Sequence, residues 1–334
     1  MKAVTFVGKR DVRVVEVPTP SAGCDGVVVR VRACGICGTD LHVYNSALFV
    51  DVSSTDIAGY PIIGHEFTGE VVEVGPEAAA AGWRVGERVA SVHNKGGMAE
   101  YACIPGQWLK DLYRLPADLP YSTAVTLEPL CNPVHSFNLR PPRDGETVAI
   151  FGAGVIGLGY LQVVKACSGA RTVVVDVSPL RLDLARRLGA DVTLNARETD
   201  PVREIKALTG EHRVRYQTKT AGGCDVVVDC TGRAGALAQA LEVAKPAGGA
   251  AVLAGIFEDE VPVEINTVLF KHMDVHGSMG YHPAETAEAL RLITSGRVRR
   301  DLLVTHTFPL EQAAEAFRVQ GDASVSVKVI LANG

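Results

Sequence analysis

Aromatic residues are scarce in this chain, and neither sign of charge predominates. Aromatics make up 6% of the 334 residues, and the formal net charge is only −5. A near-balance of this kind gives no long-range attraction to phosphate backbones or anionic lipid, so we expect no nucleic-acid or membrane partner. The polar segment 211–223, with its arginines and histidine, is interpreted as a mobile surface loop rather than a nucleic-acid patch.

Long hydrophobic runs are also missing. The first six residues, Met1 to Phe6, lack the apolar stretch of a secretion signal. The most apolar segment, 148–164, is shorter than the roughly 20 residues that span a bilayer and is interrupted by four glycines. We therefore expect a cytoplasmic protein.

Cysteines are too few for a disulfide scaffold. The chain has eight, spread from position 24 to position 230. In a reducing compartment most such thiols are small buried hydrophobic groups. At 47% hydrophobic and 21% charged residues, the composition is that of an ordinary globular protein long enough for two domains.

The hydrophobic pattern changes near Asp144. The first 100 residues look all-β, with valine-rich runs at 12–17, 27–31 and 70–74 separated by glycine and proline. After Asp144, short apolar runs alternate with helical patterns, which is typical of a parallel sheet covered on both faces. The expected strands are 147–151, 172–175, 226–228 and 250–254, and the helices after the first three end near Ser168, Leu188 and Ala244; two more helices (283–294 and about 310–319) and a strand (326–330) follow.

A glycine-rich turn follows the first of these strands. Its residues, Gly152-Ala153-Gly154-Val155-Ile156-Gly157, match GxGxxG between a strand and a helix. Gly152 permits the tight turn, Gly154 lets the backbone approach a pyrophosphate, and Gly157 lets helix and strand pack closely. The helix N-terminus, where Val155 and Ile156 lie, offers N–H groups to phosphate. The pattern predicts a Rossmann dinucleotide site.

The residue at the end of the next strand indicates which dinucleotide binds. Asp176 lies 19 residues after Gly157, where a carboxylate can accept hydrogen bonds from ribose hydroxyls but repels a 2′-phosphate. The nearby Arg181 is interpreted as stacking on the adenine or lying in solvent. NAD is therefore expected rather than NADP.

Metal-binding residue types cluster before residue 70. Cys34-Gly35-Ile36-Cys37 is compatible with a zinc knuckle or a redox pair, but no second pair of knuckle ligands lies nearby and the segment is β-rich. Thr39 and His42 follow Cys37, and His65-Glu66 comes later. A thiolate, an imidazole and a carboxylate suit a catalytic zinc, although spacing alone does not show that these side chains converge.

Taken together, these motifs resemble the zinc-dependent branch of the medium-chain dehydrogenase/reductase superfamily over essentially the whole chain. The segments 37–45 and 128–135 are most similar to the threonine and sorbitol dehydrogenase group. The resemblance implies a GroES-like catalytic domain at 1–130, a Rossmann domain at 131–277 and a C-terminal return to the catalytic domain at 278–334, which gives an α/β fold with a doubly wound parallel sheet.

The resemblance also implies the roles of individual residues. Cys37 and His65 would bind a single catalytic zinc, with Glu66 and Glu128 as acidic partners that bind it directly or indirectly, and Cys34 would not. Glu66 would also belong to the catalytic residues. Thr39 and His42 would relay the substrate proton. No cysteine lies at 90–98, so a structural zinc is not expected. The expected cofactor contacts are Gly152, Gly154, Val155, Ile156, Gly157, Asp176, Arg181, Thr231, Gly255 and Ser278.

The activity that follows is the reversible oxidation of a secondary alcohol to a ketone, in a homodimer or homotetramer. Tyr44, His93 and Tyr281 are expected in the substrate pocket. Threonine dehydrogenases typically place an arginine about where Tyr281 falls, and tyrosine supplies no cationic partner for a carboxylate. A neutral polyol or cyclitol is therefore favoured over L-threonine. More remote alternatives are a zinc-independent enoyl or quinone reductase and a non-catalytic nucleotide-binding relative.

Overall fold

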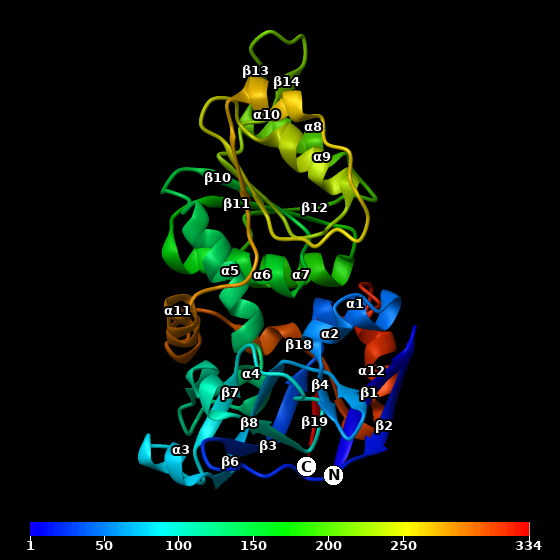
Figure 1. The fold of residues 1–334 in the computed structure, drawn as a ribbon. Coiled ribbons are helices and arrows are strands. Elements are labelled where there is room, and N and C mark those ends of the chain that lie inside the picture. Colours follow the sequence, from blue (N-terminus) through cyan, green and yellow to red (C-terminus); the bar gives the residue numbers. More distant parts are fainter. Residues whose placement is uncertain (334) are drawn as a thin grey trace. The chain divides into compact units, whose positions relative to one another are not determined.

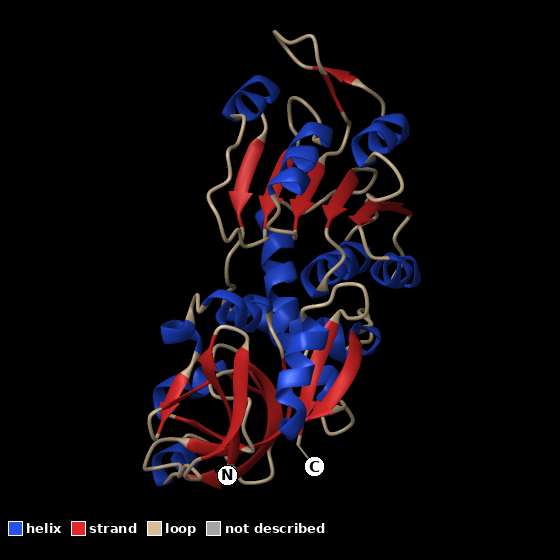
Figure 2. Ribbon diagram, turned by 90° about the vertical axis from the view of Figure 1, so that its right-hand side faces the viewer, coloured by secondary structure: helices blue, strands red, loops and turns tan. Residues whose placement is uncertain are grey.

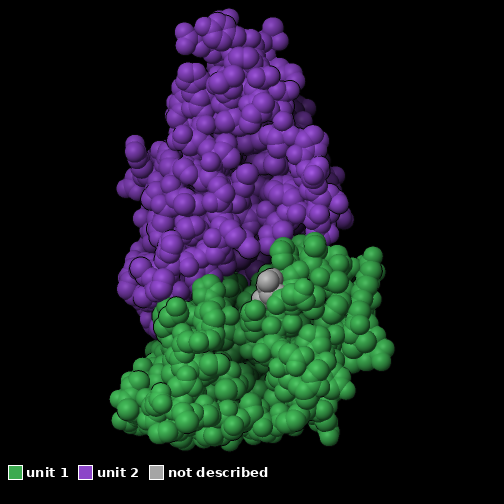
Figure 3. Space-filling model, in the orientation of Figure 1, with its two compact units in different colours: residues 1–129, 300–334 green, residues 130–299 purple. Residues whose placement is uncertain are grey.

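The computed structural model describes residues 1–333 and divides into two compact units. Unit 1 comprises Met1–Pro129 and Arg300–Gly334, and unit 2 comprises Leu130–Arg299; Figure 3 colours them separately. The first break lies one residue before the domain boundary expected after residue 130. The boundary expected after Gly277 falls inside unit 2.

Unit 1 is built from two antiparallel-rich sheets (Figure 1). One has the order β18-β19-β3-β6-β7-β9, with β8 also paired to β3, and the other has the order β2-β1-β5-β4. Alternate valines of β3, together with Phe67 and Val71 of β6, contribute to the hydrophobic core of this unit. The strands are β1 (Lys2–Gly8), β2 (Asp11–Glu16), β3 (Val27–Gly35), β4 (Thr55–Ile57), β5 (Tyr60–Ile62), β6 (Glu66–Val74), β7 (Arg88–Ser91), β8 (Tyr101–Ile104), β9 (Leu112–Arg114), β18 (Val304–Pro309) and β19 (Lys328–Ala332).

The end of the chain completes the main sheet of unit 1. Strand β19 pairs antiparallel with β3, with Ile330 opposite Gly35 and Leu331 opposite Cys34. Helix α12 (Ala313–Gln320) packs Phe317 into the same core. A β-rich unit of this kind was implied by the resemblance to GroES-like domains. The remaining unit 1 helices are α1 (Gly38–Ser46), α2 (Val50–Ser53), α3 (Pro76–Ala80) and α4 (Tyr121–Ala124), with 3-10 turns η1 (Gly106–Asp111), η2 (Arg300–Leu303) and η3 (Leu310–Gln312).

Unit 2 contains a six-stranded parallel sheet in the order β12-β11-β10-β15-β16-β17. The order reverses between β10 and β15, which is the switch point of a doubly wound nucleotide-binding fold. The α/β fold prediction is confirmed. Helices α8 and α9 lie on one face of this sheet, and α6 and α7 lie on the other (Figures 1 and 2). The strands are β10 (Thr147–Phe151), β11 (Arg171–Asp176), β12 (Val192–Asn195), β15 (Val226–Asp229), β16 (Ala250–Leu253) and β17 (Asp274–Gly277).

The apolar segment 148–164 forms β10 and helix α6 (Val155–Cys167). Both lie in the interior of unit 2, and α6 is buried along most of its length. Burial on all sides explains why this stretch is apolar throughout. Within residues 1–333, no helix is both long enough and apolar enough to span a bilayer.

Several elements differ from the sequence-based expectation. The first 100 residues are not all-β, because α1, α2 and α3 interrupt the strands. Two βα units were missed, one containing β12 and α8 (Pro201–Thr209) and one containing α10 (Ile265–Lys271) and β17. Strand β12 is only partly buried, so its apolar signal is weak. For α8 a signal was present: the Asp200 side chain accepts hydrogen bonds from Val202 N and Arg203 N, as an Asp-Pro helix start predicts.

The segment 211–223 is not simply a loop. It carries a two-stranded antiparallel hairpin, β13 (His212–Arg213) and β14 (Thr220–Ala221), with Tyr216 82% exposed at the tip. The remaining helices are α5 (Leu127–Leu139), α7 (Pro179–Arg187), α9 (Ala234–Val243) and α11 (Pro283–Thr294).

Candidate metal and dinucleotide sites

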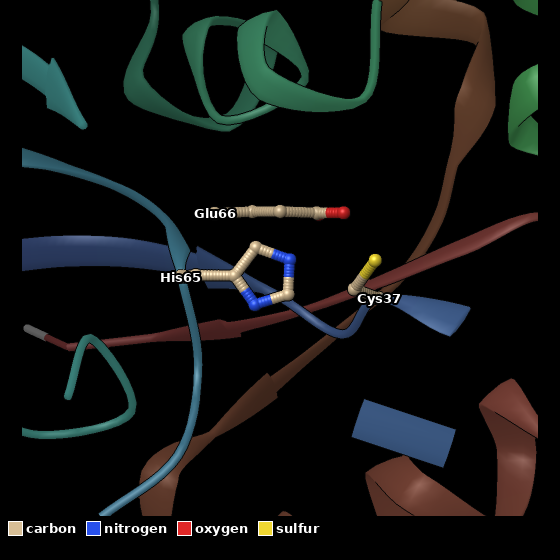
Figure 4. A group of neighbouring side chains, drawn as sticks. All are labelled: Cys37, His65 and Glu66. Carbon is tan, nitrogen blue, oxygen red and sulfur yellow. The ribbon is translucent and has the colours of Figure 1, made fainter. Parts of the chain in front are cut away.

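Three side chains with metal-binding atoms meet in unit 1. Cys37 precedes α1, His65 precedes β6, and Glu66 is the first residue of β6. One ligand atom from each lies within 4.8 Å of the others. Figure 4 shows the Cys37 sulfur, one nitrogen of the His65 ring and the Glu66 carboxylate facing a common point. A sulfur, an imidazole and a carboxylate form a donor set that zinc accepts.

The register between β3 and β6 creates this meeting point. Gly35 lies opposite Glu66 in the antiparallel pair, so the end of β3 and the start of β6 are adjacent. A Cβ at Gly35 would lie 2.2 Å from Glu66 Oε2, so glycine leaves the room that the carboxylate occupies. Gly64 has a φ of +93° and turns the chain into His65.

Asp40 supports both Cys37 and His65. Its Oδ2 accepts a hydrogen bond from Cys37 N at 2.9 Å, which fixes the start of α1. Its Oδ1 lies 4.0 Å from Nδ1 of His65. The side chain is fully buried. This separation is longer than a hydrogen bond, so Asp40 acts on His65 through its charge: it adds to the larger effect of Cys37 in raising the pKa of His65.

Lys328 of β19 holds the third member of the cluster. Its Nζ donates to Glu66 Oε2 at 2.6 Å and to Ile36 O at 2.9 Å. Both side chains of the pair are almost fully buried. Burial alone would lower the pKa of Lys328, but the charges of Glu66 and Cys37 raise it above its usual value, so Lys328 stays protonated.

The residues fit a bound cation. Glu66 Oε1 and Asp40 Oδ1 are buried acceptors for which residues 1–333 provide no hydrogen-bond donor. Burial and the Glu66 carboxylate raise the pKa of the Cys37 thiol, and His65 opposes this. Two buried carboxyl groups, Asp40 and Glu66, therefore lie near only one buried lysine, Lys328. Buried acceptors in excess of donors are stabilised by a metal ion, which this donor set can hold.

Glu128 lies close to this cluster but is not a member of it. It is buried in the first turn of α5, and its charge raises the pKa of both Cys37 and His65. The group whose ligand atoms lie within 4.8 Å of one another contains Glu66 and not Glu128. Of the two acidic partners considered from sequence, Glu66 is therefore the one in ligand position in this structure.

Thr39 and His42, the two residues expected to relay a proton, both lie on α1. Thr39 Oγ1 is in hydrogen-bond contact with Cys37 Sγ at 3.7 Å. The His42 ring lies edge-on to Phe49, with ring centroids 6.1 Å apart, and is partly exposed. Cys37, Thr39 and His42 are all partly exposed.

The residues expected in the substrate pocket lie in different parts of the chain. The Tyr44 ring packs on Phe317 with centroids 5.2 Å apart, in the packing of α1 on α12. His93 has a φ of +70°, a backbone conformation that is uncommon outside glycine and asparagine. The pKa of His93 is lowered by burial, against the opposing charge of Asp111. Tyr281 belongs to unit 2 and lies just before α11.

In unit 2 the glycine-rich turn has the geometry that the pattern predicts. Gly152 has a φ of +95° and Gly154 precedes the first residue of α6, Val155. A Cβ at Gly157 would lie 1.8 Å from the Gly152 carbonyl oxygen. A Cβ at Gly154 would meet only Arg181 Nη1, at 3.8 Å. Open space at Gly154 and close packing at Gly157 are what a phosphate-binding turn requires.

Asp176 ends β11 beside this turn. Its Oδ2 accepts from Ala153 N at 2.6 Å, and its Oδ1 accepts from Val177 N at 2.7 Å and Ser178 N at 2.8 Å. The carboxylate therefore fixes the glycine-rich turn in addition to its expected contact with ribose. Sequence reasoning missed this bond to Ala153. The Arg181 guanidinium lies beside Gly154, with Nη1 3.8 Å from the place that a Cβ there would occupy.

The other expected cofactor contacts follow the strands of the second half of the sheet. Thr231 follows β15, and its Oγ1 donates to Asp229 Oδ1 at 2.6 Å. Gly255 follows β16, and a Cβ there would lie 2.2 Å from Gly232 N. Ser278 follows β17. All three lie at the carboxyl edge of the sheet, where doubly wound folds bind their ligands.

Two residues of the metal cluster were missed from the sequence. Asp40 lies inside the segment 37–45, but the resemblance gave it no role. Lys328 is the one charged residue in the apolar run Val327-Lys328-Val329-Ile330-Leu331. A lysine that interrupts a buried strand is a signal for a buried partner, and that signal could have been used.

Comparisons with known proteins cover both units. Residues 23–116 match the family model of the alcohol dehydrogenase GroES-like domain, and residues 155–295 match that of the zinc-binding dehydrogenases. L-threonine 3-dehydrogenase of Pyrococcus furiosus is 33% identical, over 91% of this chain and 90% of its own. Erythritol/L-threitol dehydrogenase of Mycolicibacterium smegmatis is 32% identical, over 99% and 97%. The crystal structure of 2R,3R-butanediol dehydrogenase from Bacillus subtilis superimposes with a TM-score of 0.85 at 29% identity, covering 100% of this chain and 99% of that one.

Proposed function

The chain belongs to the zinc-binding dehydrogenase family, in the threonine and sorbitol dehydrogenase group of medium-chain dehydrogenases, and on that premise we propose its reaction. It oxidises a neutral secondary alcohol, such as a polyol or cyclitol, to a ketone and transfers hydride to NAD. The reaction is reversible and depends on one zinc ion per chain.

The observation that carries this proposal is the cluster of Cys37, His65 and Glu66. Three ligands of mixed type leave zinc an open position, as catalytic rather than structural sites do. We propose that these three residues bind the metal and that Glu128 adds a nearby negative charge. The buried Glu66 Oε1, which has no donor within residues 1–333, supports this choice over direct binding by Glu128 alone.

Each surrounding side chain has a task in this proposal. Zinc, when bound, lowers the pKa of an alcohol hydroxyl, as it lowers that of water from about 15.7 to about 7. Asp40 adds a negative charge beside His65, and Lys328 holds one oxygen of Glu66 so that the other stays available. Thr39 Oγ1 accepts the substrate proton while its own hydroxyl proton moves on toward the His42 imidazole, which releases a proton to solvent.

NAD is proposed as the cofactor because of the charges beside the glycine-rich turn. The Asp176 carboxylate lies at the position where a ribose 2′-phosphate would be repelled. Its three bonds to backbone N–H groups keep it in place. Arg181, beside Gly154, is placed to pair with the cofactor phosphates.

A neutral substrate is proposed because Tyr281 offers no positive charge to a carboxylate. Similarity to an erythritol/L-threitol dehydrogenase over nearly the whole chain supports a polyol. The alternative, L-threonine, is favoured by the similarity to L-threonine 3-dehydrogenases at 33% identity.

The test is a panel of substrates with NAD and with NADP, followed by NADH absorbance with zinc content measured in parallel. We expect a C4 to C6 polyol or cyclitol to have a kcat/KM at least tenfold above that of L-threonine, since the missing charge-assisted pair is worth roughly 1.5–3 kcal/mol. A preference for L-threonine would favour the alternative, and full activity of the zinc-free protein would refute the proposal.

We also propose that two copies pair through the outer edge of unit 2. Strand β17 is bonded only to β16, so its other edge has no strand partner within residues 1–333. Large hydrophobic residues on and beside β17 and α10 are exposed: Val263, Ile265, Leu269, Val275 and Met279. An open edge and an apolar patch on one side are typical of a self-pairing surface with two-fold symmetry.

Charge placed in this patch should separate the copies. Replacing Val275 and Leu269 together with lysine, V275K/L269K, is expected to weaken self-association by at least 100-fold, because burying two unpaired charges costs several kcal/mol. Sedimentation equilibrium at micromolar concentration measures this. The matched control places lysine at the exposed Val85 of unit 1, far along the chain, and should leave the oligomer intact. A monomeric wild-type protein would contradict the proposal.

A further inference from the structure

Side chains of helix α5 form hydrogen bonds at both ends of the segment that follows β17. Ser136 Oγ and Ser278 Oγ lie 2.7 Å apart at the start of this segment. At its end, His135 Nδ1 donates to both oxygens of Glu285, at 3.0 and 3.1 Å. Asn138 Nδ2 adds a third bond to Glu285 at 3.2 Å. We call residues 278–282, which lie between these two anchors, the strap.

Glu285 also fixes the strap from within its own helix. It lies in the first turn of α11, and its Oε2 accepts a hydrogen bond from His282 N at 2.7 Å. Glu285 is only 8% exposed. Burial alone would raise the pKa of Glu285, but the bonds from His282 N, His135 and Asn138 lower it below its usual value. The anchor is therefore a charged, buried carboxylate held by three donors.

The strap depends on these anchors for its position. It has no regular secondary structure, and Met279 at its centre is 75% exposed. Gly280 has a φ of +72°, which lets the strap turn sharply before His282. A short segment without regular secondary structure opens more easily than a strand or helix unless its ends are held.

The topology places the strap beside the expected cofactor. The strap leaves β17 at the carboxyl edge of the sheet, the edge that also carries the glycine-rich turn and Thr231. In this strand order a dinucleotide places one half over β10 to β12, where Asp176 lies, and the other half over β15 to β17. The strap therefore borders the nicotinamide half and not the adenosine half.

We propose that Glu285 is a positioning residue that holds the strap against the nicotinamide half of the cofactor, acting through His135, Asn138 and His282 without touching the cofactor itself. This inference rests on the proposed use of NAD and adds a residue to the site that neither the motifs nor the metal cluster contains. In this proposal, hydrogen bonds between α5 and α11 hold the strap in place (Figure 1).

The test compares two ligands that share the adenosine half. In Glu285→Gln, isothermal titration should show an increase of about tenfold in the Kd for NADH, the effect of one lost charge-assisted anchor. The Kd for ADP-ribose, which lacks the nicotinamide ring, should change by less than about twofold, because Asp176 and the glycine-rich turn are unaltered. Glu285→Asp, which keeps the charge, should restore part of the NADH affinity.

A matched control is available on the same helix. Glu288 lies one turn further along α11 and pairs with the exposed Arg291, with Oε1 and Nη2 2.6 Å apart. Glu288→Gln should leave both affinities unchanged. A double-mutant cycle of His135→Asn with Glu285→Gln should be non-additive for NADH affinity, since both changes remove the same bond.

The outcomes separate the inference from the function that it rests on. Unchanged NADH affinity in Glu285→Gln would overturn the role proposed for Glu285. An equal loss of NADH and ADP-ribose affinity would overturn it as well, because that result indicates a general loss of unit 2 structure. Thermal unfolding of each variant supports that distinction. If the wild-type protein bound neither ADP-ribose nor NADH, the proposed function itself would be overturned.

Discussion

Replacing Cys37 or His65 with alanine is expected to remove the zinc and to lower kcat by more than about 100-fold. Even residues that only support a zinc ligand are worth roughly 10–100-fold in metal affinity or activity, so loss of a ligand exceeds that range. The side chains lie within 4.8 Å of Glu66 and of each other, so two ligands would be left to hold the ion. Elemental analysis of the purified variants, together with steady-state rates, measures both effects.

The chain offers a graded set of controls for this prediction. Cys34→Ala changes the other cysteine of the same Cys-x-x-Cys segment, which is buried in β3, and should retain zinc and activity. Asp40→Asn should weaken zinc binding by about 10–100-fold. His42→Ala should retain zinc but slow turnover and flatten its dependence on pH. Full zinc occupancy in His65→Ala would contradict the proposed ligand set.

The second large effect is expected when either of two glycines in the glycine-rich turn is replaced by alanine. One replacement should weaken cofactor binding, and the other should lower the stability of the fold. Gly154→Ala should raise the Kd for NADH by about 100-fold, or about 2.8 kcal/mol, because a methyl group there occupies the path of the pyrophosphate. Its folded structure should be unaffected, since the nearest atom to the new Cβ is Arg181 Nη1 at 3.8 Å.

Gly157→Ala, in contrast, should destabilise the fold itself. The new Cβ would lie 1.8 Å from the Gly152 carbonyl oxygen, so α6 must move away from the turn. Overpacking of this kind costs typically about 1–3 kcal/mol, which lowers the Tm by several degrees in a unit of this size. Calorimetry and NADH titration of both variants separate the effects. A normal Tm in Gly157→Ala, or tight NADH binding in Gly154→Ala, would show that the turn is used differently.

The nucleotide-binding half was the more predictable part of the protein. Its signals are local: a strand, a glycine turn, a helix and an acidic residue follow one another within about 30 residues, and each requirement falls on one position. The strands β10 and β11 and the helices α6 and α7 accordingly lie close to where the pattern placed them. Strand β12 was missed because it is partly exposed, and β17 because its residues are mostly exposed at the sheet edge.

The metal cluster was less predictable. The types of its residues could be read from the sequence, but their convergence could not, because the register between β3 and β6 brings Cys37 and Glu66 together. Lys328 enters from the last strand, 262 residues after Glu66. The strap illustrates the same limit, since Glu285 and His135 are 150 residues apart.

The sequence by itself determined the doubly wound half, the glycine-rich turn, the acidic residue from which NAD is proposed and the kinds of ligand offered to a metal. These follow from backbone conformation and side-chain chemistry at neighbouring positions. Only the tertiary structure decided that Glu66 rather than Glu128 lies with Cys37 and His65, that Lys328 neutralises one of its oxygens, and that Glu285 is tied to α5. Strand register and helix packing set which distant side chains share a buried space, and no local pattern encodes that choice.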